Sequence, residues 1–420
     1  MTTSASRLRI PGLRWWIVGM LFLAAVLNYI DRSLLGLLAP TIQKDLGISD
    51  SQYAQIVNAF LIAYTIAYLL SGRVVDRVGS RLGMSLFIGW WSAANALTAA
   101  ATSAATLGLY RFLLGLGEAG GFTASPKIVA EWFPATERAL AVGIYSLGGS
   151  VGATIAPVLV IALAATWGWQ GAFVATGILG LVWILPWWWL AHRPHEHPRI
   201  TDHERALVPP PVPAPVAVDE RALWLGVIRQ PVVWWLLAAR LLTDAVWYFY
   251  QFWLPKYLHD IRGVPQEGLT IIWVVFLAAD IGFLSGGFLS GRLVRRGATP
   301  PAARLWIMLG CAALIPTSAL IPLAPSVGWV LAGAMVVVLA HAAWLANMTS
   351  LVVDIVPKPI LGTSFGLIAA GSAAGGILMN SLVAGQAKAG NYDPCFLFMA
   401  APHPLALLLI WRLRRLPAQA

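Results

Sequence analysis

The first long apolar run of the chain, residues 15–39, reads WWIVGMLFLAAVLNYIDRSLLGLLA. Only two of its residues, Asp31 and Arg32, carry a charge. A helix needs about 20 predominantly apolar residues to cross the hydrocarbon core of a bilayer, so this run is long enough to span a membrane. No small-residue cleavage pattern interrupts it, and we therefore interpret it as a retained helix and not as a secretory signal.

Eleven further apolar runs follow, each bounded by charges, glycine or proline. They cover residues 52–72, 82–103, 106–126, 138–166, 171–190, 231–258, 267–291, 302–323, 327–353, 360–386 and 395–412. Of all 420 residues, 59% are hydrophobic and 11% are charged, a balance that excludes an ordinary soluble protein. The 21 Trp, 15 Phe and 10 Tyr also exclude a disordered chain. The sequence predicts an all-α membrane protein with twelve transmembrane helices.

A polar, proline-rich stretch, residues 191–230, divides the chain into two parts with six apolar runs each. It contains VPPPVPAP at 208–215, a composition typical of a semi-extended linker. We therefore expect an N-terminal half at 1–190 and a C-terminal half at 231–420.

Four histidines lie in this linker: His192, His195, His197 and His203. They resemble a metal cluster, but prolines break up the stretch, and we expect a solvated loop without a metal site. The two cysteines, Cys311 and Cys395, lie in apolar runs and provide neither a disulfide framework nor a thiolate metal site. The sequence predicts no cofactor.

Basic residues concentrate on one face of the predicted membrane topology. Lys plus Arg number 28 against 18 Asp plus Glu, and 21 of the 28 fall before the first run, after the even-numbered runs or in the linker. In a soluble protein the net charge of +10 would suggest a nucleic-acid partner; in a membrane protein it reflects cytoplasmic loops. We expect cytoplasmic termini and linker, a bacterial inner membrane, no nucleic-acid partner and a monomer.

The two halves repeat each other at constant offsets. A separation of 215 relates Pro40 to Pro255, Gly72 to Gly287, Arg77 to Arg292 and Arg81 to Arg296. A separation of 223 relates Gly143 to Gly366, Gly148 to Gly371, Gly152 to Gly375 and Phe173 to Phe396. A parallel repeat of six helices is typical of transporters whose site lies between the halves near the bilayer midplane. The glycines of the second set also predict close and smooth helix packing.

Few charged residues lie inside the predicted spans, and each suggests a function because an unpaired charge there costs several kcal/mol. They are Asp31, Arg32, Arg111, Glu118, Arg240, Asp244 and Asp280. Arg111 and Glu118 are seven residues apart, so they can point into one cavity. A guanidinium binds a carboxylate with two parallel hydrogen bonds, so the arginines suggest an anionic substrate.

The embedded acids allow more than one interpretation. Asp31 and Glu118 can exchange protons with the cavity, or either acid can instead pair permanently with an arginine. For Arg240 and Asp244, at i and i+4, we prefer an internal ion pair to a substrate role. Asp280 is either a second proton site or a helix-cap partner.

The segment Gly72-Arg73-Val74-Val75-Asp76-Arg77-Val78-Gly79-Ser80-Arg81 resembles the signature loop of the major facilitator superfamily. The second copy, from Gly287 to Gly297, has Gly291 where the aspartate would stand. Further motifs resemble the anion:cation symporter family, and within it bacterial hexuronate:proton symporters. They are NYIDR at 28–32, Arg111 to Glu118, GWQGAF at 168–173, LTDAVWYFY at 242–250, FWLP at 252–255 and FLAAD at 276–280. The chain departs from that pattern at Tyr145-Ser146 and Met379-Asn380.

This resemblance implies roles for particular residues. Arg32 and Arg111 would hold the substrate carboxylate, and Asp31 and Glu118 would carry the coupling protons. The resemblance fits Tyr29 and Tyr64 best as sugar contacts. Further candidate contacts, for which helix packing or an interfacial aromatic belt is an equal alternative, are Trp247, Tyr250, Gln251, Trp344 and Asn347. The gating loop would use Gly72, Asp76, Arg77, Gly79 and Arg81.

The resulting functional hypothesis is a proton-coupled symporter that imports a sugar acid by alternating access, with glucuronate or galacturonate as the leading substrates. Within the same class, an aldonate or an aromatic carboxylate is the alternative. A non-transporting membrane sensor and a membrane-embedded enzyme remain alternatives of a different class. An enzyme would need acidic or histidine residues on sizeable non-cytoplasmic loops, which the sequence does not predict.

Overall fold

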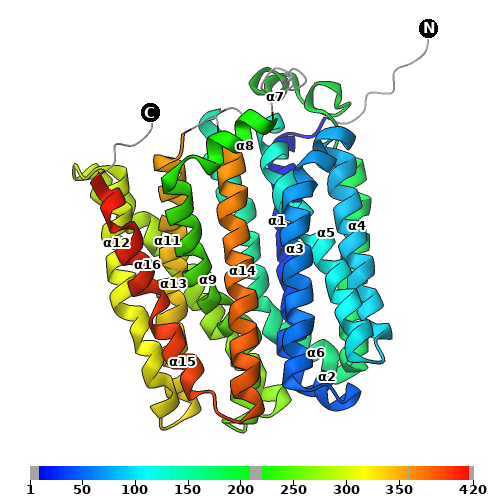
Figure 1. The fold of residues 1–420 in the computed structure, drawn as a ribbon. Coiled ribbons are helices and arrows are strands. Elements are labelled where there is room, and N and C mark those ends of the chain that lie inside the picture. The colour runs from blue at the N-terminus through cyan, green and yellow to red at the C-terminus, as the bar shows by residue number, and fades with distance from the viewer. Residues whose placement is uncertain (1–8, 134, 209–219, 358–359, 416–420) are drawn as a thin grey trace.

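The computed structural model describes residues 9–133, 135–208, 220–357 and 360–415. Every regular element in these ranges is helical. Most of the long helices run roughly side by side and form one bundle (Figure 1). The linker helices α7 (Asp202–Leu207) and α8 (Glu220–Ile228) lie at one end of the bundle, which we call the linker end. We call the opposite end the far end.

The first part of the chain forms six helices. They are α1 (Leu13–Leu37), α2 (Ala39–Leu46), α3 (Asp50–Val78), α4 (Ser80–Leu97), α5 (Ala104–Trp132) and α6 (Ala135–Leu190). Capping boxes start two of them, with Ser49 and Gln52 at α3 and Ser103 and Thr106 at α5. Such reciprocal bonds satisfy backbone N–H groups that a helix start otherwise leaves free, so the chain re-enters the bundle at defined residues.

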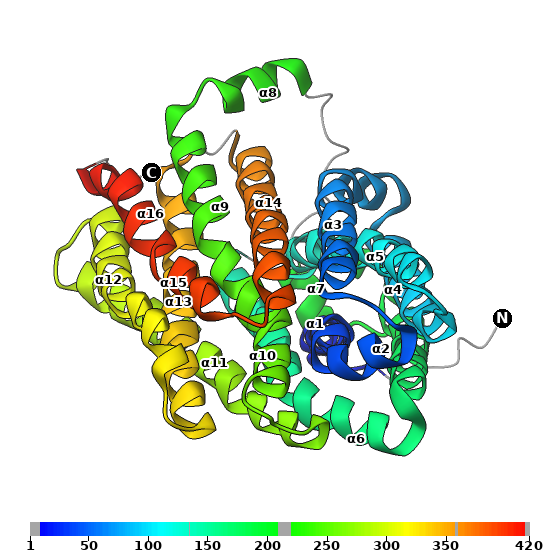
Figure 2. The same cartoon turned by 60° about the horizontal axis from the view of Figure 1, so that its bottom comes forward.

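A single glycine separates the fifth and sixth apolar runs. The predicted ranges 138–166 and 171–190 belong to the one element α6, which turns at Gly168 with φ of 71° and ψ of 174°. A left-handed φ is open to glycine at no steric cost, so the chain turns here without a loop. The two runs therefore run in opposite directions, with the corner between them at the far end (Figure 2).

The linker is more structured than the composition predicts. Besides α7 and α8 it contains a short 3-10 helix, η2 (Pro194–Glu196). Glu204 of α7 accepts a hydrogen bond from the backbone N–H of Leu13 at 3.1 Å, and its carboxylate lies 3.7 Å from Arg14. The linker is therefore tied to the start of α1. Most of the proline-rich segment, residues 209–219, lies outside the described residues.

The second part of the chain repeats the pattern with more interruptions. Its elements are α9 (Pro231–Phe252), α10 (Leu254–Asp260), η3 (Gln266–Ile272), α11 (Trp273–Arg295), α12 (Pro300–Leu314), η4 (Ile315–Leu323), α13 (Val327–Ile355), α14 (Leu361–Lys388), α15 (Asp393–Ala400), α16 (Pro402–Ile410) and η6 (Trp411–Arg415). The predicted helices 231–258 and 395–412 are interrupted at Trp253 and Ala401. Trp253 lies two residues before Pro255, and Ala401 directly precedes Pro402. Proline lacks the backbone N–H that would donate to the preceding turn, so it interrupts the helix.

The outer surface of the bundle suits a bilayer. Eight segments among the described residues are long and apolar enough to cross a membrane. Large apolar side chains lie exposed on it, including Leu185 at 71%, Leu284 at 66% and Leu408 at 76%. In a soluble protein such exposure would be costly, whereas lipid tails provide an apolar surrounding. The fold is that of an all-α membrane protein.

The sequence repeat is reproduced in the helix packing. A Cβ added to Gly148 or Gly152 on α6 would lie 2.3 or 2.5 Å from the backbone oxygen of Phe22 or Val26 on α1. The counterparts at offset 223, Gly371 and Gly375 on α14, meet Leu237 and Leu241 on α9 in the same way, at 3.0 and 1.9 Å. These α9 residues follow their α1 equivalents at offset 215. Glycine is thus required at equivalent helix crossings in both parts of the chain.

Candidate functional site

A buried ion pair joins α1 to α5 inside the first part of the bundle. Arg32 donates through Nε and Nη2 to Oε2 of Glu118, at 3.0 and 2.8 Å. Arg32 is 7% exposed and Glu118 is fully buried. The other carboxylate oxygen of Glu118, Oε1, has no hydrogen-bond partner among the described residues. The arginine predicted to bind the substrate and the acid predicted to carry a proton therefore bind each other.

Arg111, the second predicted substrate arginine, is much less satisfied. It is fully buried on α5, seven residues before Glu118. Its Nη1 donates to the backbone oxygen of Asp31 at 3.4 Å, while Nε and Nη2 have no partner in the described part of the chain. Leaving a buried donor of a charged group unpaired costs more than about 1–3 kcal/mol. Arg111 thus presents two free N–H groups that suit a carboxylate.

Aromatic rings surround the two guanidinium groups. The ring centroids of Tyr64 and Tyr29 lie 4.8 and 5.0 Å from Cζ of Arg32. The ring centroid of Phe60 lies 5.6 Å from Cζ of Arg32 and 5.3 Å from Cζ of Arg111, so one ring contacts both cations. Ring faces are attractive to cations and also exclude water from them. Both tyrosines were predicted from the sequence, whereas Phe60 was not, because nothing in its apolar run distinguishes it from a packing residue.

Asp31 lies apart from this ion pair. Its Oδ1 accepts a hydrogen bond from Nδ2 of Asn95 on α4 at 2.8 Å, and its Oδ2 is unpartnered within the described ranges. Asn95 also donates to the hydroxyl of Thr176 on α6 at 2.8 Å. No ion pair between Asp31 and an arginine is present among the described residues, which does not support the alternative of a permanent pair. Asn95 was not predicted, because a lone amide in an apolar run carries no distinguishing pattern.

On α9, Arg240 and Asp244 form the expected internal ion pair. Nη2 of Arg240 lies 2.6 Å from Oδ2 of Asp244, which confirms the preference for pairing at i and i+4. The same helical face continues to Trp247 and Gln251, at spacings of three and four. Both side-chain polar atoms of Gln251 are buried without a partner among the described residues. The hydrogen-bonding groups of this amide are thus unsatisfied within the described part of the chain.

Three other residues predicted to contact the sugar, Tyr250, Trp344 and Asn347, form hydrogen bonds and ring contacts only with described residues of the second part of the chain. The hydroxyl of Tyr250 lies 3.0 Å from that of Ser318. Trp344 packs against the ring of His403, with centroids 4.9 Å apart. Asn347 donates to the backbone oxygens of Ala343 and Gly286 at 2.8 and 3.1 Å. In this conformation these side chains stabilise helix packing.

Asp280 joins the two parts of the bundle. Thr154 on α6 donates to its Oδ2 at 3.0 Å, and Oδ1 is unpartnered among the described residues. The carboxyl therefore acts as a bridge between α6 and α11, a role that sequence analysis did not consider. Its position in the middle of α11 excludes the predicted helix-cap role, because a cap lies at the end of a helix.

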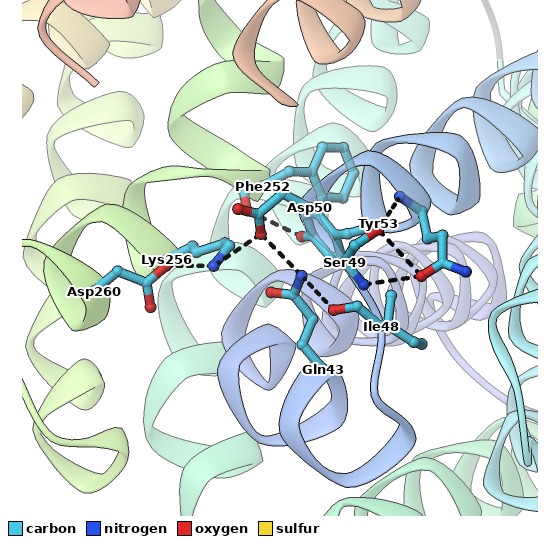
Figure 3. Close-up of polar contacts among 9 residues, drawn as sticks. Gln43, Ile48, Ser49, Asp50, Tyr53, Phe252, Lys256 and Asp260 are labelled. Atoms are coloured by element: carbon cyan, nitrogen blue, oxygen red, sulfur yellow. Dashed lines mark hydrogen bonds and ion pairs between the residues drawn. The ribbon is translucent and has the colours of Figure 1, made fainter. Parts of the chain in front are cut away.

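A network of charged and polar residues closes the far end (Figure 3). Nζ of Lys256 on α10 lies 3.1 Å from Oδ1 of Asp50 at the start of α3 and also contacts Asp260 of its own helix. The hydroxyl of Tyr53 donates to the backbone oxygen of Phe252 at 3.0 Å. Gln43 donates to Asp50 at 3.0 Å and fixes its carboxylate. The two parts of the chain are thus held together at this end.

A second cross-bundle contact uses Asn380, the residue that departs from the family pattern. Its Nδ2 donates to Asn58 of α3 at 3.2 Å, and its Oδ1 accepts from Nε1 of Trp253 at 2.8 Å. Asn58 in turn donates to Ser381 at 3.3 Å. Asn380 is fully buried, so it forms a polar link between α3, α14 and the break after α9.

The far end also carries a groove of mixed polar and apolar lining with a cavity volume of about 600 Å³. Its lining comes from α2, α6 and η3 and includes Thr41, Lys44, Asp45, Trp169, Gln170, Gln266 and Glu267. Trp169 donates to Asp45 at 2.8 Å, and Thr41 donates to Gln266 at 3.0 Å. Both parts of the chain therefore contribute to this groove.

Comparison with known proteins agrees with this architecture. The sequence profile described as Major Facilitator Superfamily matches residues 21–379. The chain belongs to this superfamily. It is therefore a membrane transporter and not an enzyme.

Two relatives agree with the resemblance to sugar-acid transporters. The "Hexuronate transporter" of Escherichia coli (strain K12) is 28% identical over 417 residues, which cover 96% of this chain and 94% of that protein. The "Galacturonate transporter" of Dickeya chrysanthemi is 32% identical over 284 residues, covering 67% of this chain and 82% of that protein. The predicted resemblance to this group is confirmed.

A solved structure has the same fold. It is that of a bacterial homologue of the human lysosomal transporter Spinster in an inward-facing, unoccupied conformation. It aligns over 96% of both chains with a TM-score of 0.71 and 20% sequence identity. At this identity the likeness concerns the fold alone.

The signature loop of this transporter joins α3 to α4 at the linker end. Gly79 has φ of 84° and separates the two helices, and Arg77 is exposed in the last turn of α3. The guanidinium of Arg81 donates to the backbone oxygen of Trp188 and lies 4.3 Å from its ring. Gly72 and Asp76 belong to α3, but their surroundings lie outside the described part of the structure.

The linker histidines of the transporter do not form a metal site among the described residues. Contrary to the expectation of a solvated loop, His197 is buried; its Nδ1 accepts from the backbone N–H of Arg199 at 3.0 Å and its Nε2 lies 3.1 Å from the oxygen of Leu190. Burial, with a smaller effect from His192, lowers the pKa of His197 to about 4. The neutral ring therefore fixes the linker to the end of α6.

Proposed function

We propose that this transporter is a proton-coupled symporter that imports a sugar acid, with a hexuronate such as glucuronate or galacturonate as substrate. The observation that carries the proposal is the arrangement around Arg32. Its guanidinium is held by Glu118, while the neighbouring Arg111 has two buried N–H groups without a partner among the described residues. The site thus contains positive charge for an anion and an acid that competes with that anion.

Proton coupling follows from this competition. With Asp31 and Glu118 ionised, their charges cancel those of Arg32 and Arg111. A proton on Glu118 weakens its bonds to Arg32 and leaves the site with a net positive charge, which favours a substrate carboxylate between the arginines. Asp31 is the second member of the proton-carrying pair, and Asn95 orients its carboxyl. Protons are assigned to the pair, because interacting acids titrate together.

Sugar recognition would use both parts of the transporter. Tyr29 and Tyr64 cover Arg32 and offer ring faces and hydroxyl groups to a polyhydroxylated ligand. Gln251 supplies an unpartnered amide and Trp247 a ring face on α9. Tyr250, Trp344 and Asn347 would join the site only after the C-terminal half rearranges.

The proposed membrane arrangement has twelve transmembrane helices, six in an N-terminal half (1–190) and six in a C-terminal half (231–420), with 191–230 as the linker. The linker end, with both termini, faces the cytoplasm because the basic residues concentrate there, and the membrane is the bacterial inner membrane. The far end then faces outward and is closed in this conformation by the Asp50–Lys256 contact. The loop from Gly72 to Arg81, with Asp76, Arg77 and Gly79, would gate the cytoplasmic side.

The test is uptake into vesicles that contain the purified transporter. Labelled glucuronate and galacturonate are supplied with and without an inward proton gradient, and an aldonate and an aromatic carboxylate are tested in parallel. Gradient-driven accumulation of a hexuronate supports the proposal. If only the aldonate or the aromatic carboxylate accumulates, the substrate belongs to that class and not to the hexuronates. If none of the acids accumulates, proton symport is refuted.

The coupling role of Glu118 needs a separate variant. Glu118→Gln should keep exchange of substrate between equal pools but lose accumulation driven by a pH gradient, because the amide cannot exchange a proton. The matched control is Glu137→Gln, which removes another acid–arginine pair, with Arg14 at 3.1 Å, outside the site. Unchanged driven uptake by Glu118→Gln would refute the assignment.

A further inference from the structure

Two histidines that the proposed function does not use lie in contact inside the C-terminal half. Nδ1 of His341, in the middle of α13, lies 3.2 Å from Nε2 of His403, near the start of α16. They are 1% and 0% exposed. Imidazole is the side chain that exchanges protons most readily near neutral pH, so a buried pair in a transporter suggests proton binding.

The ring nitrogens of this pair are only half satisfied. A neutral imidazole has one N–H and one lone pair. The bond between the rings uses one of each, which leaves one N–H and one lone pair on the outer nitrogens, His341 Nε2 and His403 Nδ1. Neither outer nitrogen has a partner in the described ranges. The free lone pair is therefore a place where a proton can add.

The helix that carries His403 is broken at this point. α15 ends at Ala400 and α16 begins at Pro402, and a second proline, Pro404, follows His403. The prolines cannot donate to the preceding turn, and the oxygen of Phe398 accepts instead from the backbone N–H of Ala401 at 3.4 Å. Broken helices in transporters recur at ion-binding sites.

The neighbours of the pair connect it to the candidate site. Trp247 stacks on His341 with ring centroids 5.8 Å apart and lies on the α9 face that carries Arg240 and Asp244. Among the described residues, Asp244 and Arg240 are the charged groups that act on His341, and His341 is the titratable group that acts on His403. While Arg240 is paired with Asp244, the effects of their opposite charges on the two histidines largely cancel.

We propose that His341 and His403 form a second proton-binding site, which takes up one proton per transport cycle when Arg240 releases Asp244. A substrate anion near α9 would draw Arg240 away and leave the negative charge of Asp244 facing His341. A proton from solution then adds to the free lone pair, and the imidazolium is shared by the two rings. When the substrate leaves, Arg240 returns and the proton goes back to solution. This inference rests on the proposed symport.

The test measures the steady-state accumulation ratio in vesicles under a pH gradient, with the membrane potential clamped to zero. Each coupled proton multiplies this ratio by about ten per pH unit. His341→Gln and His403→Gln should each lower the ratio about tenfold per pH unit while still transporting glucuronate or galacturonate. His259→Gln is the matched control, because His259 lies on α10 at the far end and contacts the backbone oxygen of Val264.

The outcomes are distinguishable. A purely structural role would slow transport but leave the accumulation ratio unchanged, and that result in both variants would overturn the proposal. If wild-type vesicles accumulate none of the acids, the proposed symport fails first. Nitrogen-15 NMR of the wild-type histidines provides a test that needs neither variant: a second N–H on one ring of the pair between pH 5 and pH 8, with glucuronate or galacturonate added, supports the site, and its absence refutes it.

Discussion

Replacing Asp50 by Asn should open the far end of the transporter. Asp50 lies 3.1 Å from Lys256 across the two halves, and the two side chains are 18% and 9% exposed, so water screens their contact only partly. Hydrogen bonds to charged groups contribute about 1.5–3 kcal/mol. At about 1.4 kcal/mol per tenfold change, their loss should shift the equilibrium toward an open far end by roughly ten- to one-hundred-fold. Tyr53 and Asn380 would still hold part of the contact.

The assay is the distribution of distances between spin labels in nanodiscs. Cysteines at Thr102 and Ser326, exposed far-end residues of opposite halves, carry the labels. Asp50→Asn should add a population with a longer distance. Asp260→Asn is the matched control, because it removes a contact of Lys256 within α10 and crosses no boundary between the halves. An unchanged distribution in Asp50→Asn, or equal opening in Asp260→Asn, would refute the reasoning.

Three further predictions concern stability. Gly375→Ala should lower the thermal unfolding midpoint, since its Cβ would lie 1.9 Å from the oxygen of Leu241 and overpacking costs about 1–3 kcal/mol or more; Gly366→Ala, with nothing within 4 Å, should leave the midpoint unchanged or raise it. Asn380→Leu should cost about 1–3 kcal/mol by leaving the indole N–H of Trp253 unpaired, and an unchanged midpoint would contradict the proposed link. Burial lowers the pKa of His197 from its ordinary value of 6.5 to about 4, so the neutral ring stabilises the fold fully above pH 6.5 and progressively less as the pH falls toward 4. The unfolding midpoint of the wild type should therefore decline more steeply between pH 6.5 and pH 4 than that of His197→Asn. Parallel declines of the two midpoints would exclude this role.

Patterns of apolar residues were enough to predict the helices, but not their interruptions. The chain turns at Gly168, a single residue with positive φ inside a mostly apolar stretch. Hydropathy therefore separates the two runs but does not show that a one-residue turn connects them. The break at Ala401 has a local cause in Pro402 and Pro404, which could have been noticed. The glycine repeat was predictable because close helix crossings require glycine wherever they occur.

The charged residues of the candidate site were predictable for a different reason. A charge is so costly inside a membrane that Arg32, Arg111 and Glu118 are conspicuous in sequence. The pairing of these charges was not predictable, because Arg32 and Glu118 are 86 positions apart and contact each other only through helix packing. His341 and His403 gave no signal at all, since a single histidine in an apolar run has no pattern until its neighbour across the bundle is known.

The groove at the far end has a practical consequence. It is formed by α2 and α6 from one half and η3 from the other, so its shape exists only while these halves are closed against each other there. The long third loop of a nanobody suits concave surfaces of this kind. A nanobody selected for the groove would therefore be specific for one conformation, and it could serve both as an inhibitor that stops the cycle and as a rigid marker for electron cryomicroscopy.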